Sequence, residues 1–355
     1  MITISVCMIV KNEEHRLGRC LDSLTGIADE IIIVDTGSMD DTKDIAAKYT
    51  DKIYDFKWVD DFSAARNFAF SKAGCEYIYS ADADEIIDET NQARFKQIKE
   101  ILLPEIDIVQ MKYLNMMENN TTYNFKMELR PKLYKRLRTF TWTDPIHETV
   151  ILDPVIYDSD IEIQHMAEGN HSKRDMKALL KCFDSGKPFS KKLHSMYAKE
   201  LFIAGDDNDF EAARHVFEDT IKDSFRSADE YKEAACVLAR CYRLNGDIDG
   251  FFKLCLKDMV TTPCSEICME LGYYFFDKED YEEAHVWFEN AHSETESIIY
   301  IRSSGDLPLI GLAKCCTKLA AKYENTDKYL SQMYMKEAQK NAEAADAWQL
   351  PANIG

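Results

Sequence analysis

The sequence has little glycine and proline and no long hydrophobic run. Its 355 residues include 13 glycines and 8 prolines, while 46% of the residues are hydrophobic. This composition excludes a collagen-like, low-complexity or largely disordered chain, because ample apolar surface is available to bury a core. No apolar stretch approaches the roughly 18 residues that a membrane-spanning helix needs. We therefore expect a globular chain with no membrane partner.

Basic residues are scarce relative to acidic residues. The chain has 43 lysines and arginines against 63 aspartates and glutamates, which gives a formal net charge of −20. Such a charge disfavours non-specific binding to nucleic acid or to anionic lipid. A phosphate-bearing substrate would need a bound cation or a local cluster of donors to offset the repulsion. We therefore expect no nucleic-acid partner.

Paired cysteine spacings of the kind that bind metals are absent, although the chain has 11 cysteines. Cys315 and Cys316 are adjacent, and Cys264 and Cys268 are four residues apart with no second such pair. The apolar start of the sequence carries no basic signal segment, and the cysteine total is odd. These features predict free thiols, most of them in the core, and a cytoplasmic protein.

Short β-branched runs alternate with amphipathic stretches in the first half of the chain. This alternation predicts a mostly parallel sheet covered by helices, which is an α/β fold. The stretch from Lys112 to about Ile163 is strand-rich and broken by prolines, which is typical of a mixed-sheet edge and of loops over a site. The expected strands are Ile2–Val10, Glu30–Asp35, Lys52–Phe56, Tyr77–Ser80 and Ile106–Met111.

After about residue 171 the strand pattern ends and helical patterns recur. Segments beginning at Met196, Cys236 and Met269 each predict a helix, a tight polar turn and a second helix. Their spacing is near the tetratricopeptide (TPR) period of about 34 residues. We expect three repeats and a capping helix from Leu309; a helical bundle without repeat symmetry is the alternative. The predicted domains are residues 1–171 and 172–355.

Acidic residues follow two of the expected strands. Asp82 and Asp84 come directly after the strand that ends at Ser80, and Asp35 ends the second strand. The carboxyl ends of parallel strands meet at one edge of a sheet, where α/β proteins bind ligands. Carboxylate oxygens suit Mg²⁺ or Mn²⁺, and such a cation neutralises a diphosphate. An acidic turn that caps the next helix is the structural alternative.

Four segments in the first half carry a family resemblance. They are Ser5–Glu14, Ile32–Thr42, Asp61–Asn67 and Asp82–Glu85. Together they resemble the family 2 glycosyltransferases of the GT-A fold over about the first 170 residues. With the helical repeats that follow, the chain is similar to bacterial enzymes that modify proteins or peptides, such as bacteriocin S-glycosyltransferases and flagellin glycosyltransferases.

The resemblance implies roles for individual residues. Nucleotide-sugar binding would fall to Glu13, Asp35, Arg66 and Asp82. Arg66 would lie beside the base or the diphosphate, and a solvated helix cation is its alternative role.

The resemblance also implies a cation site and a base. The ligands of Mg²⁺ or Mn²⁺ would be Asp82, Asp84 and His165, and the catalytic base would be Glu148. An inverting transfer needs a carboxylate to take the proton of the acceptor. Many relatives have a glycine shortly before the His-Glu segment, where this chain has Asp144 and Pro145, so Asp144 is the competing base.

We therefore predict a metal-dependent inverting glycosyltransferase. A GT-A domain with a Rossmann-like mixed sheet would be followed by an all-α TPR-like domain. We expect the donor to be a nucleotide sugar, with UDP as its nucleotide. We expect the acceptor to be a protein or peptide that the repeats bind. The repeats would also allow the chain to form a homodimer. Two alternatives stay open: a glycan acceptor at the cell surface, and a non-catalytic TPR scaffold whose nucleotide-sugar domain only senses its ligand.

Overall fold

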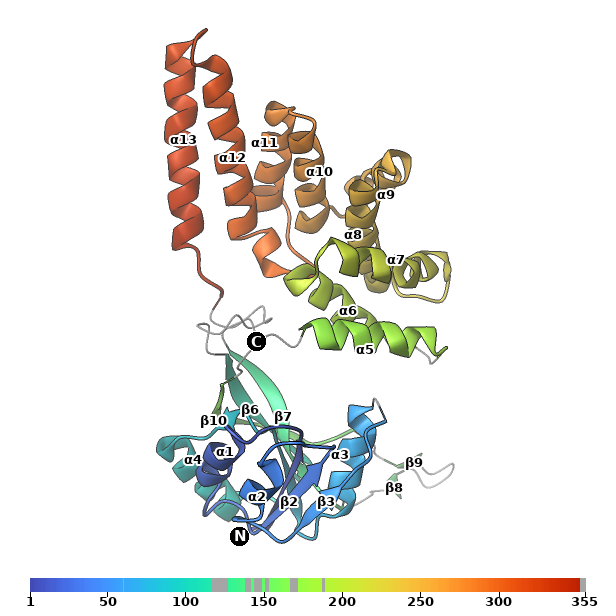
Figure 1. Cartoon of the computed structure of the whole chain (residues 1–355), viewed down its shortest axis with the longest axis vertical. Coiled ribbons are helices and arrows are strands. Elements are labelled where there is room, and N and C mark those ends of the chain that lie inside the picture. The colour runs from blue at the N-terminus through green and yellow to red at the C-terminus, as the bar shows by residue number, and fades with distance from the viewer. Residues whose placement is uncertain are drawn as a thin grey trace. The chain divides into compact units, whose positions relative to one another are not determined.

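The structure is a computed structural model of the whole chain. It describes residues 1–59, 61–115, 127–137, 142–143, 149–150, 153–166, 172–186 and 189–351. The chain forms two compact units, Met1–Gly169 and Asn170–Pro351 (Figure 1). The domain boundary at residue 171 stays a prediction, because residues 167–171 lie outside the described residues.

A mixed eight-stranded sheet forms the centre of the N-terminal unit, in the order β3-β2-β1-β4-β7-β6-β10-β5. Strand β1 pairs in parallel with β2 and β4, and β2 pairs in parallel with β3. The carboxyl ends of these four strands therefore share one edge. Strand β7 runs antiparallel to β4 and β6, which makes the sheet mixed as predicted. The strands are β1 (Ile4–Val10), β2 (Glu30–Asp35), β3 (Ile53–Asp55), β4 (Tyr77–Ala81), β5 (Glu85–Ile86), β6 (Ile108–Asn115), β7 (Met127–Lys135) and β10 (Ile156–His165).

Helices cover this sheet on both faces. The core on one face joins Met8 of β1 to Leu21 and Phe95 of the covering helices, and the core on the other face joins Cys7 to Ala69. Because β1 is buried on both faces, it forms the continuous apolar run that predicted a parallel strand. The helices are α1 (Leu17–Ser23), α2 (Thr42–Ala46), α3 (Phe62–Ser71) and α4 (Glu89–Ile101). A separate two-stranded sheet pairs β8 (Trp142–Thr143) with β9 (Thr149–Val150).

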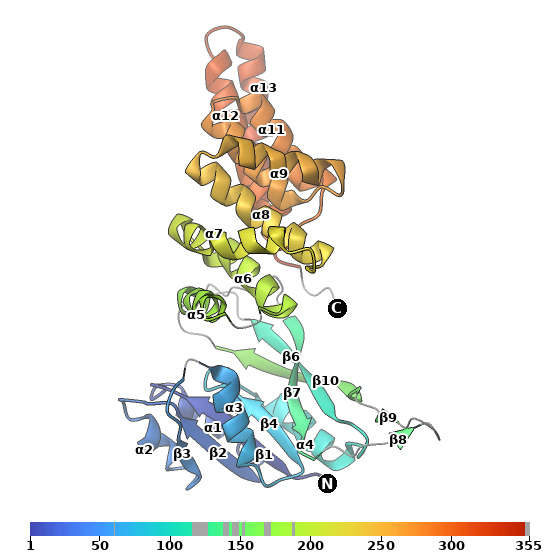
Figure 2. The ribbon, with the colours of Figure 1, turned by 90° about the vertical axis from the view of Figure 1, so that its right-hand side faces the viewer.

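The C-terminal unit is all-helical in its described residues, as predicted. Figure 2 shows its helices stacked in chain order. Three helix pairs, α6 with α7, α8 with α9, and α10 with α11, correspond to the three expected repeats. The helices are α5 (Ser172–Asp184), α6 (Lys191–Ala204), α7 (Asp207–Lys222), α8 (Ala228–Asn245), α9 (Ile248–Val260), α10 (Ser265–Asp277), α11 (Tyr281–Glu289), α12 (Asp306–Tyr323) and α13 (Lys328–Ala347).

Two helices, α12 and α13, replace the single capping helix that the sequence predicted from Leu309. The break between them has a local cause, since the side chain of Asp327 accepts a hydrogen bond from the backbone N–H of Leu330 at 3.0 Å and starts a new helix. Earlier boundaries follow the same chemistry. Ser227 and Glu230 form a capping box at the start of α8, and Gly246 ends that helix in the left-handed conformation at φ 73°.

No helix in the described part of the chain combines the length and the apolar character that crossing a membrane requires.

Candidate active site

The turns that follow β1 and β2 are joined to each other. The backbone N–H of Asn12 donates to Ser38 Oγ at 2.9 Å, and Asn12 Oδ1 accepts from the backbone N–H of Met39 at 2.8 Å. The backbone N–H of Glu13 donates to Thr42 Oγ1 at 2.7 Å. Glu13 therefore lies in the turn after β1, on the predicted edge, where its Oε2 is 3.6 Å from Arg16 Nε.

Asp35 shapes the turn at the end of β2. Its side chain is 1% exposed, and Oδ1 accepts hydrogen bonds from the backbone N–H groups of Gly37 at 2.8 Å and Ser38 at 2.9 Å. Gly37 has a φ of 106°, a conformation that other residues rarely adopt. Asp35 thus stabilises the turn after β2 through its side chain. The nucleotide contact that the sequence predicts for this residue stays a prediction.

Asp82, at the end of β4, lies between two cationic side chains. Its Oδ1 is 3.5 Å from Arg66 Nη2, and its Oδ2 is 3.4 Å from Lys132 Nζ. Arg66 also donates to the hydroxyl of Ser80. Burial by itself raises the pKa of the Asp82 carboxyl, but the charges of Lys132 and Arg66 outweigh it and hold this pKa at about 2. Asp82 is therefore ionised at neutral pH, and its side chain remains 43% exposed.

Lys132, on β7, is a site residue that the sequence reasoning missed. It is only 5% exposed, donates to the backbone oxygen of Ser80 at 3.3 Å and forms an ion pair with Glu85, which is 2% exposed. Burial alone lowers the pKa of Lys132, but Glu85 and Asp82 raise it above its ordinary value, so the ammonium stays charged. Burial raises the pKa of Glu85 to about 7, against the effect of Lys132. The signal that could have identified Lys132 is a charged residue in the middle of β7, a strand that pairs with β4 on one side and β6 on the other.

Asp84 and His165 meet although 81 residues separate them. His165 Nε2 lies 3.2 Å from Asp84 Oδ2, and the backbone N–H of Met166 donates to the Asp84 carbonyl at 2.9 Å. Antiparallel pairing of β10 with β5 places His165 opposite Glu85 and brings the two motifs together. Burial raises the pKa of Asp84, but the hydrogen bond with His165 outweighs it, and the net pKa is below its ordinary value.

These donors fit a divalent cation in part. Asp84 and His165 offer a carboxylate oxygen and an imidazole nitrogen side by side, a donor set that Mg²⁺ or Mn²⁺ accepts. Among the described residues, the ligand atoms of Asp82, Asp84 and His165 do not all lie within 4.8 Å of one another. Asp82 lies against Arg66 and Lys132 instead, so Asp84 and His165 are the two candidate ligands that the structure brings into contact.

The predicted base is not placed. Glu148 and its competitor Asp144 both lie outside the described residues. Of the other predicted site residues, Arg66, Asp82, Asp84 and His165 lie within the described part of the N-terminal unit, where ion pairs and hydrogen bonds connect them in two groups.

The mixed sheet with acidic residues at its strand ends is GT-A-like, and comparison with known families agrees. Residues 5–151 match the family model described as Glycosyl transferase family 2. The N-terminal unit therefore carries a family 2 glycosyltransferase domain, and the predicted resemblance is confirmed.

Curated relatives match parts of the chain. The SPbeta prophage-derived glycosyltransferase SunS of Bacillus subtilis is 37% identical over 115 residues, which are 32% of this chain and 27% of that protein. A TPR repeat-containing protein of Synechococcus elongatus is 47% identical over 85 residues, 24% of this chain and 21% of that protein. The lipopolysaccharide core biosynthesis glycosyltransferase LpsC of Rhizobium meliloti is 32% identical over 109 residues, 30% of this chain and 37% of that protein. The chain thus spans 21% to 37% of the length of these relatives.

Solved structures match more distantly. Glucosyl-3-phosphoglycerate synthase from Mycobacterium tuberculosis, in complex with Mn²⁺, UDP and glucosyl-3-phosphoglycerate, is 15% identical with a TM-score of 0.37, covering 53% of this chain and 81% of that chain.

Proposed function

We propose that the chain is a divalent-cation-dependent inverting glycosyltransferase that moves a sugar from a nucleotide-sugar donor to a protein or peptide acceptor. The observation that carries this proposal is the cluster of charged side chains at the carboxyl end of β4, which lie within the residues that match the family 2 model except for His165. In that cluster Asp84 contacts His165, and Asp82 lies between Arg66 and Lys132.

The donor would lie along the shared edge of β1, β2 and β4. Arg66 and Lys132 supply local positive charge in a chain of net charge −20, which favours a diphosphate at this edge over the rest of the surface. Arg66 is 41% exposed and so remains accessible to a ligand. Glu13 and Asp35 would hold the nucleoside, and UDP is the nucleotide that we expect.

The cation would be held by Asp84 and His165, with Asp82 beside them. When bound, it would neutralise the departing diphosphate. Glu148 would take the proton from the acceptor nucleophile as the bond to the sugar forms, and Asp144 is the competing base. This division of roles is that of an inverting transfer: the base carboxylate acts on the acceptor, and the cation acts on the leaving diphosphate.

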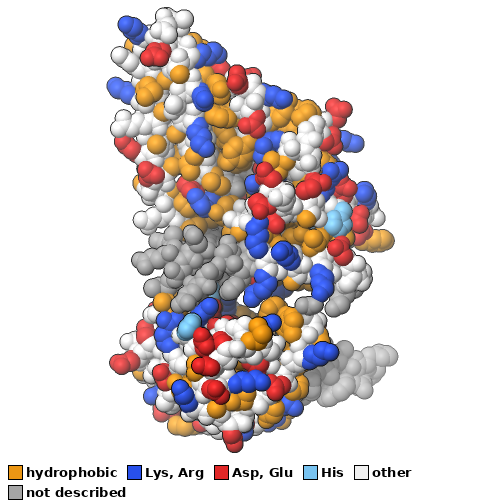
Figure 3. All heavy atoms as spheres, viewed as in Figure 1, with side chains coloured by type: hydrophobic (Ala, Val, Ile, Leu, Met, Phe, Trp, Pro, Cys, Tyr) orange, Lys and Arg blue, Asp and Glu red, His pale blue; other side chains and the backbone are white. Residues whose placement is uncertain are grey.

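The acceptor proposal rests on the C-terminal unit. A groove of about 840 Å³ lies between α12 and α13, next to α10. Figure 3 shows hydrophobic side chains exposed along these helices with lysine or arginine side chains beside them. An apolar groove with basic edges suits an extended polypeptide. Residues that line it include Phe276, Ile310, Lys314, Met335, Lys336 and Ala338.

A glycan acceptor is the second candidate. It is favoured by the relative named for lipopolysaccharide core biosynthesis, which matches 109 residues of this chain. The repeats would then serve self-association, and the mass of the chain in solution would reveal a homodimer.

A panel of nucleotide sugars, incubated with the full chain and Mg²⁺ or Mn²⁺, tests the proposal. Release of a nucleoside diphosphate from one donor would identify donor and cation together and would exclude the non-catalytic scaffold. Incorporation of the labelled sugar into the protein fraction of a cell extract is expected for a polypeptide acceptor. Incorporation only into the carbohydrate fraction would favour the glycan acceptor, and no release from any donor would contradict the proposed activity.

A further inference from the structure

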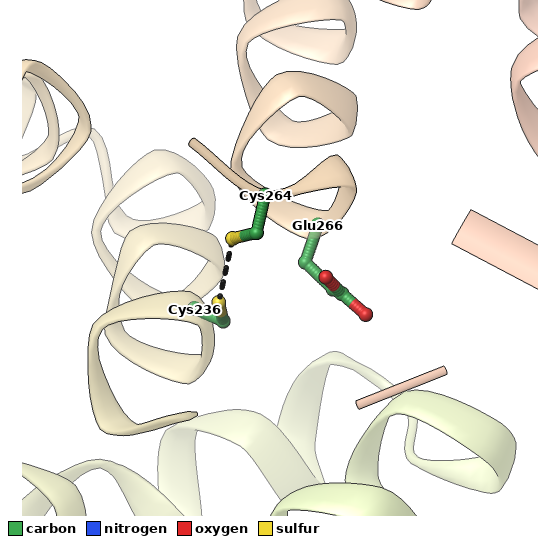
Figure 4. A group of neighbouring side chains, drawn as sticks. All are labelled: Cys236, Cys264 and Glu266. Carbon is green, nitrogen blue, oxygen red and sulfur yellow. Dashed lines mark hydrogen bonds between the residues drawn. The ribbon is translucent and has the colours of Figure 1, made fainter. Parts of the chain in front are cut away.

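Two cysteines and two carboxylates meet inside the C-terminal unit. Cys236 Sγ of α8 lies 3.5 Å from Cys264 Sγ, at the start of α10, and a carboxylate oxygen of Glu266 lies within 4.8 Å of both sulfurs (Figure 4). Asp258 Oδ2, near the end of α9, lies 3.6 Å from Cys264 Sγ. Cys236, Cys264 and Glu266 are each 0% exposed, and Asp258 is 6% exposed.

This group has little positive charge against it. In the part of the chain that the structure describes, its one ion pair is with Lys232, whose Nζ lies 3.9 Å from Asp258 Oδ1. Buried carboxylates are normally paired with a cation, hydrogen-bonded or bound to a metal. Glu266 Oε1 accepts from the backbone N–H groups of residues 298–300 at 2.9 to 3.1 Å, whereas Oε2 accepts from residue 298 alone, at 3.1 Å. A lone pair of Oε2 therefore remains for another partner.

We propose that Cys236, Cys264 and Glu266 bind a thiophilic divalent cation of the zinc class. In a tetrahedral zinc site the metal–sulfur distance of about 2.3 Å and the metal–oxygen distance of about 2.0 Å imply separations of about 3.8 Å between sulfurs and about 3.5 Å between sulfur and oxygen. The two sulfurs here lie 3.5 Å apart, and a carboxylate oxygen of Glu266 lies within 4.8 Å of both. Each thiol gives its proton to solvent as its bond to the metal forms.

The cation would connect successive repeats. Its ligands come from α8 and from the start of α10, and Glu266 also holds residues 298–300 through their backbone N–H groups. One ion would thus fix the spacing of three segments in the repeat core. The soft thiolates distinguish this site from the oxygen and nitrogen donors Asp84 and His165 in the N-terminal unit.

Cobalt titration of the full, reduced, metal-free chain tests the proposal. Co²⁺ bound to thiolates gives sulfur-to-cobalt charge-transfer absorption, which carboxylate and histidine ligands do not give. We expect this absorption to saturate at about one equivalent and to be abolished by excess Zn²⁺. Cys236→Ser and Cys264→Ser should each lose it. Cys255→Ser is the matched control, because Cys255 is 1% exposed in the same repeat core and belongs to no group of metal-ligating side chains found among the described residues.

A second group of metal-ligating side chains, His285, Cys316 and Glu337, is only partly buried, so Cys316→Ser is included and should keep the absorption.

Absence of the thiolate absorption in the wild-type chain, or its survival in both the Cys236 and the Cys264 variants, would overturn the proposal. Should those variants fail to fold by circular dichroism, alkylation of the wild-type chain decides. Zn²⁺ should slow the modification of Cys236 and Cys264 but not of Cys255, and equal rates with and without Zn²⁺ would overturn the proposal.

Discussion

Lys132 fixes the positions of two carboxylates at the end of β4. Its ammonium is buried between Asp82 and Glu85 and also donates to the backbone of Ser80. Removing one partner from such a buried arrangement leaves an uncompensated charge, which is more destabilising than the pair is stabilising. The two acids therefore differ: Asp82 is accessible and ionised, whereas Glu85 is buried and has a raised pKa.

Asp82→Asn should lower the stability of the N-terminal unit in a pH-dependent way. The folded-state pKa of about 2 lies below the ordinary 3.8, so the ionised carboxylate stabilises the fold above about pH 4, and this contribution disappears as the pH falls towards 2. Because the side chain is 43% exposed, we expect about 1 kcal/mol or less at neutral pH. Urea unfolding of both proteins from pH 7 downwards measures it. A stability difference that stays constant down to pH 2 would disagree with this assignment.

Glu148→Gln should reduce sugar transfer by roughly 10²- to 10⁴-fold, the usual effect of removing a general base, with little change in nucleotide affinity. Initial rates of transfer and calorimetric titration with the nucleotide measure the two quantities. The matched variant is Asp144→Asn. A large rate loss in Asp144→Asn together with normal rates in Glu148→Gln would identify Asp144 as the base.

At the scale of elements, the turn after β2 depends on Gly37. Gly37→Ala should destabilise the N-terminal unit by about 1 to 3 kcal/mol, because alanine is strained at a φ of 106°. The turn that Asp35 organises would shift, and nucleotide affinity should fall by about tenfold, which corresponds to about 1.4 kcal/mol. Calorimetric titration with UDP and urea unfolding measure the two effects.

Gly246→Ala is the control for that variant. Gly246 ends α8 at a φ of 73°, so alanine there should destabilise the repeats by about 1 kcal/mol and leave UDP affinity unchanged. Equal losses of UDP affinity in both variants would show that the turn after β2 has no special part in binding.

The sequence was informative where structure is local. Strands β1, β2 and β4 are mostly apolar runs because they are buried, and the helices of the repeats begin at capping residues such as Ser227. Pairing between distant segments was not predictable in the same way. Strand β5 has two residues and pairs with β10, and the position of His165 beside Asp84 depends on that pairing. Lys132 was missed because its role comes from tertiary burial and not from a motif.

At the scale of the whole molecule, the structure changes where the chain should be cut. By composition, the sequence Gly-Lys-Pro-Phe-Ser at residues 186–190, after α5, is typical of a linker and would be the first choice for a cut. Met176 and Leu179 of α5, however, belong to the core of the repeats, and α5 packs against α6 and α7. A cut after α5 would expose these apolar side chains on the shortened fragment.

A fragment of residues 1–171 should therefore fold and keep cation-dependent release of the nucleoside diphosphate, whereas a fragment of residues 1–186 should aggregate more readily. If the repeats recruit the acceptor, the shorter fragment should also lose efficient transfer to it, because recruitment acts through local concentration. Circular dichroism and gel filtration establish folding before rates are compared. A folded 1–171 fragment that glycosylates the acceptor as efficiently as the full chain would exclude recruitment by the repeats.

The central claim is that a divalent cation held by Asp84 and His165 is needed for reaction of a nucleotide sugar at the end of β4. The most direct measurement is the rate of nucleoside diphosphate release from the active donor by the full chain, in Mn²⁺ or Mg²⁺ and in excess chelator, for the wild type and for Asp84→Asn. We predict a rate that is lost in chelator, restored by the cation, and reduced by several orders of magnitude in Asp84→Asn with little loss of fold stability, since the carboxylate contributes charge compensation rather than packing. Full activity in excess chelator, or a fully active Asp84→Asn variant, would contradict it.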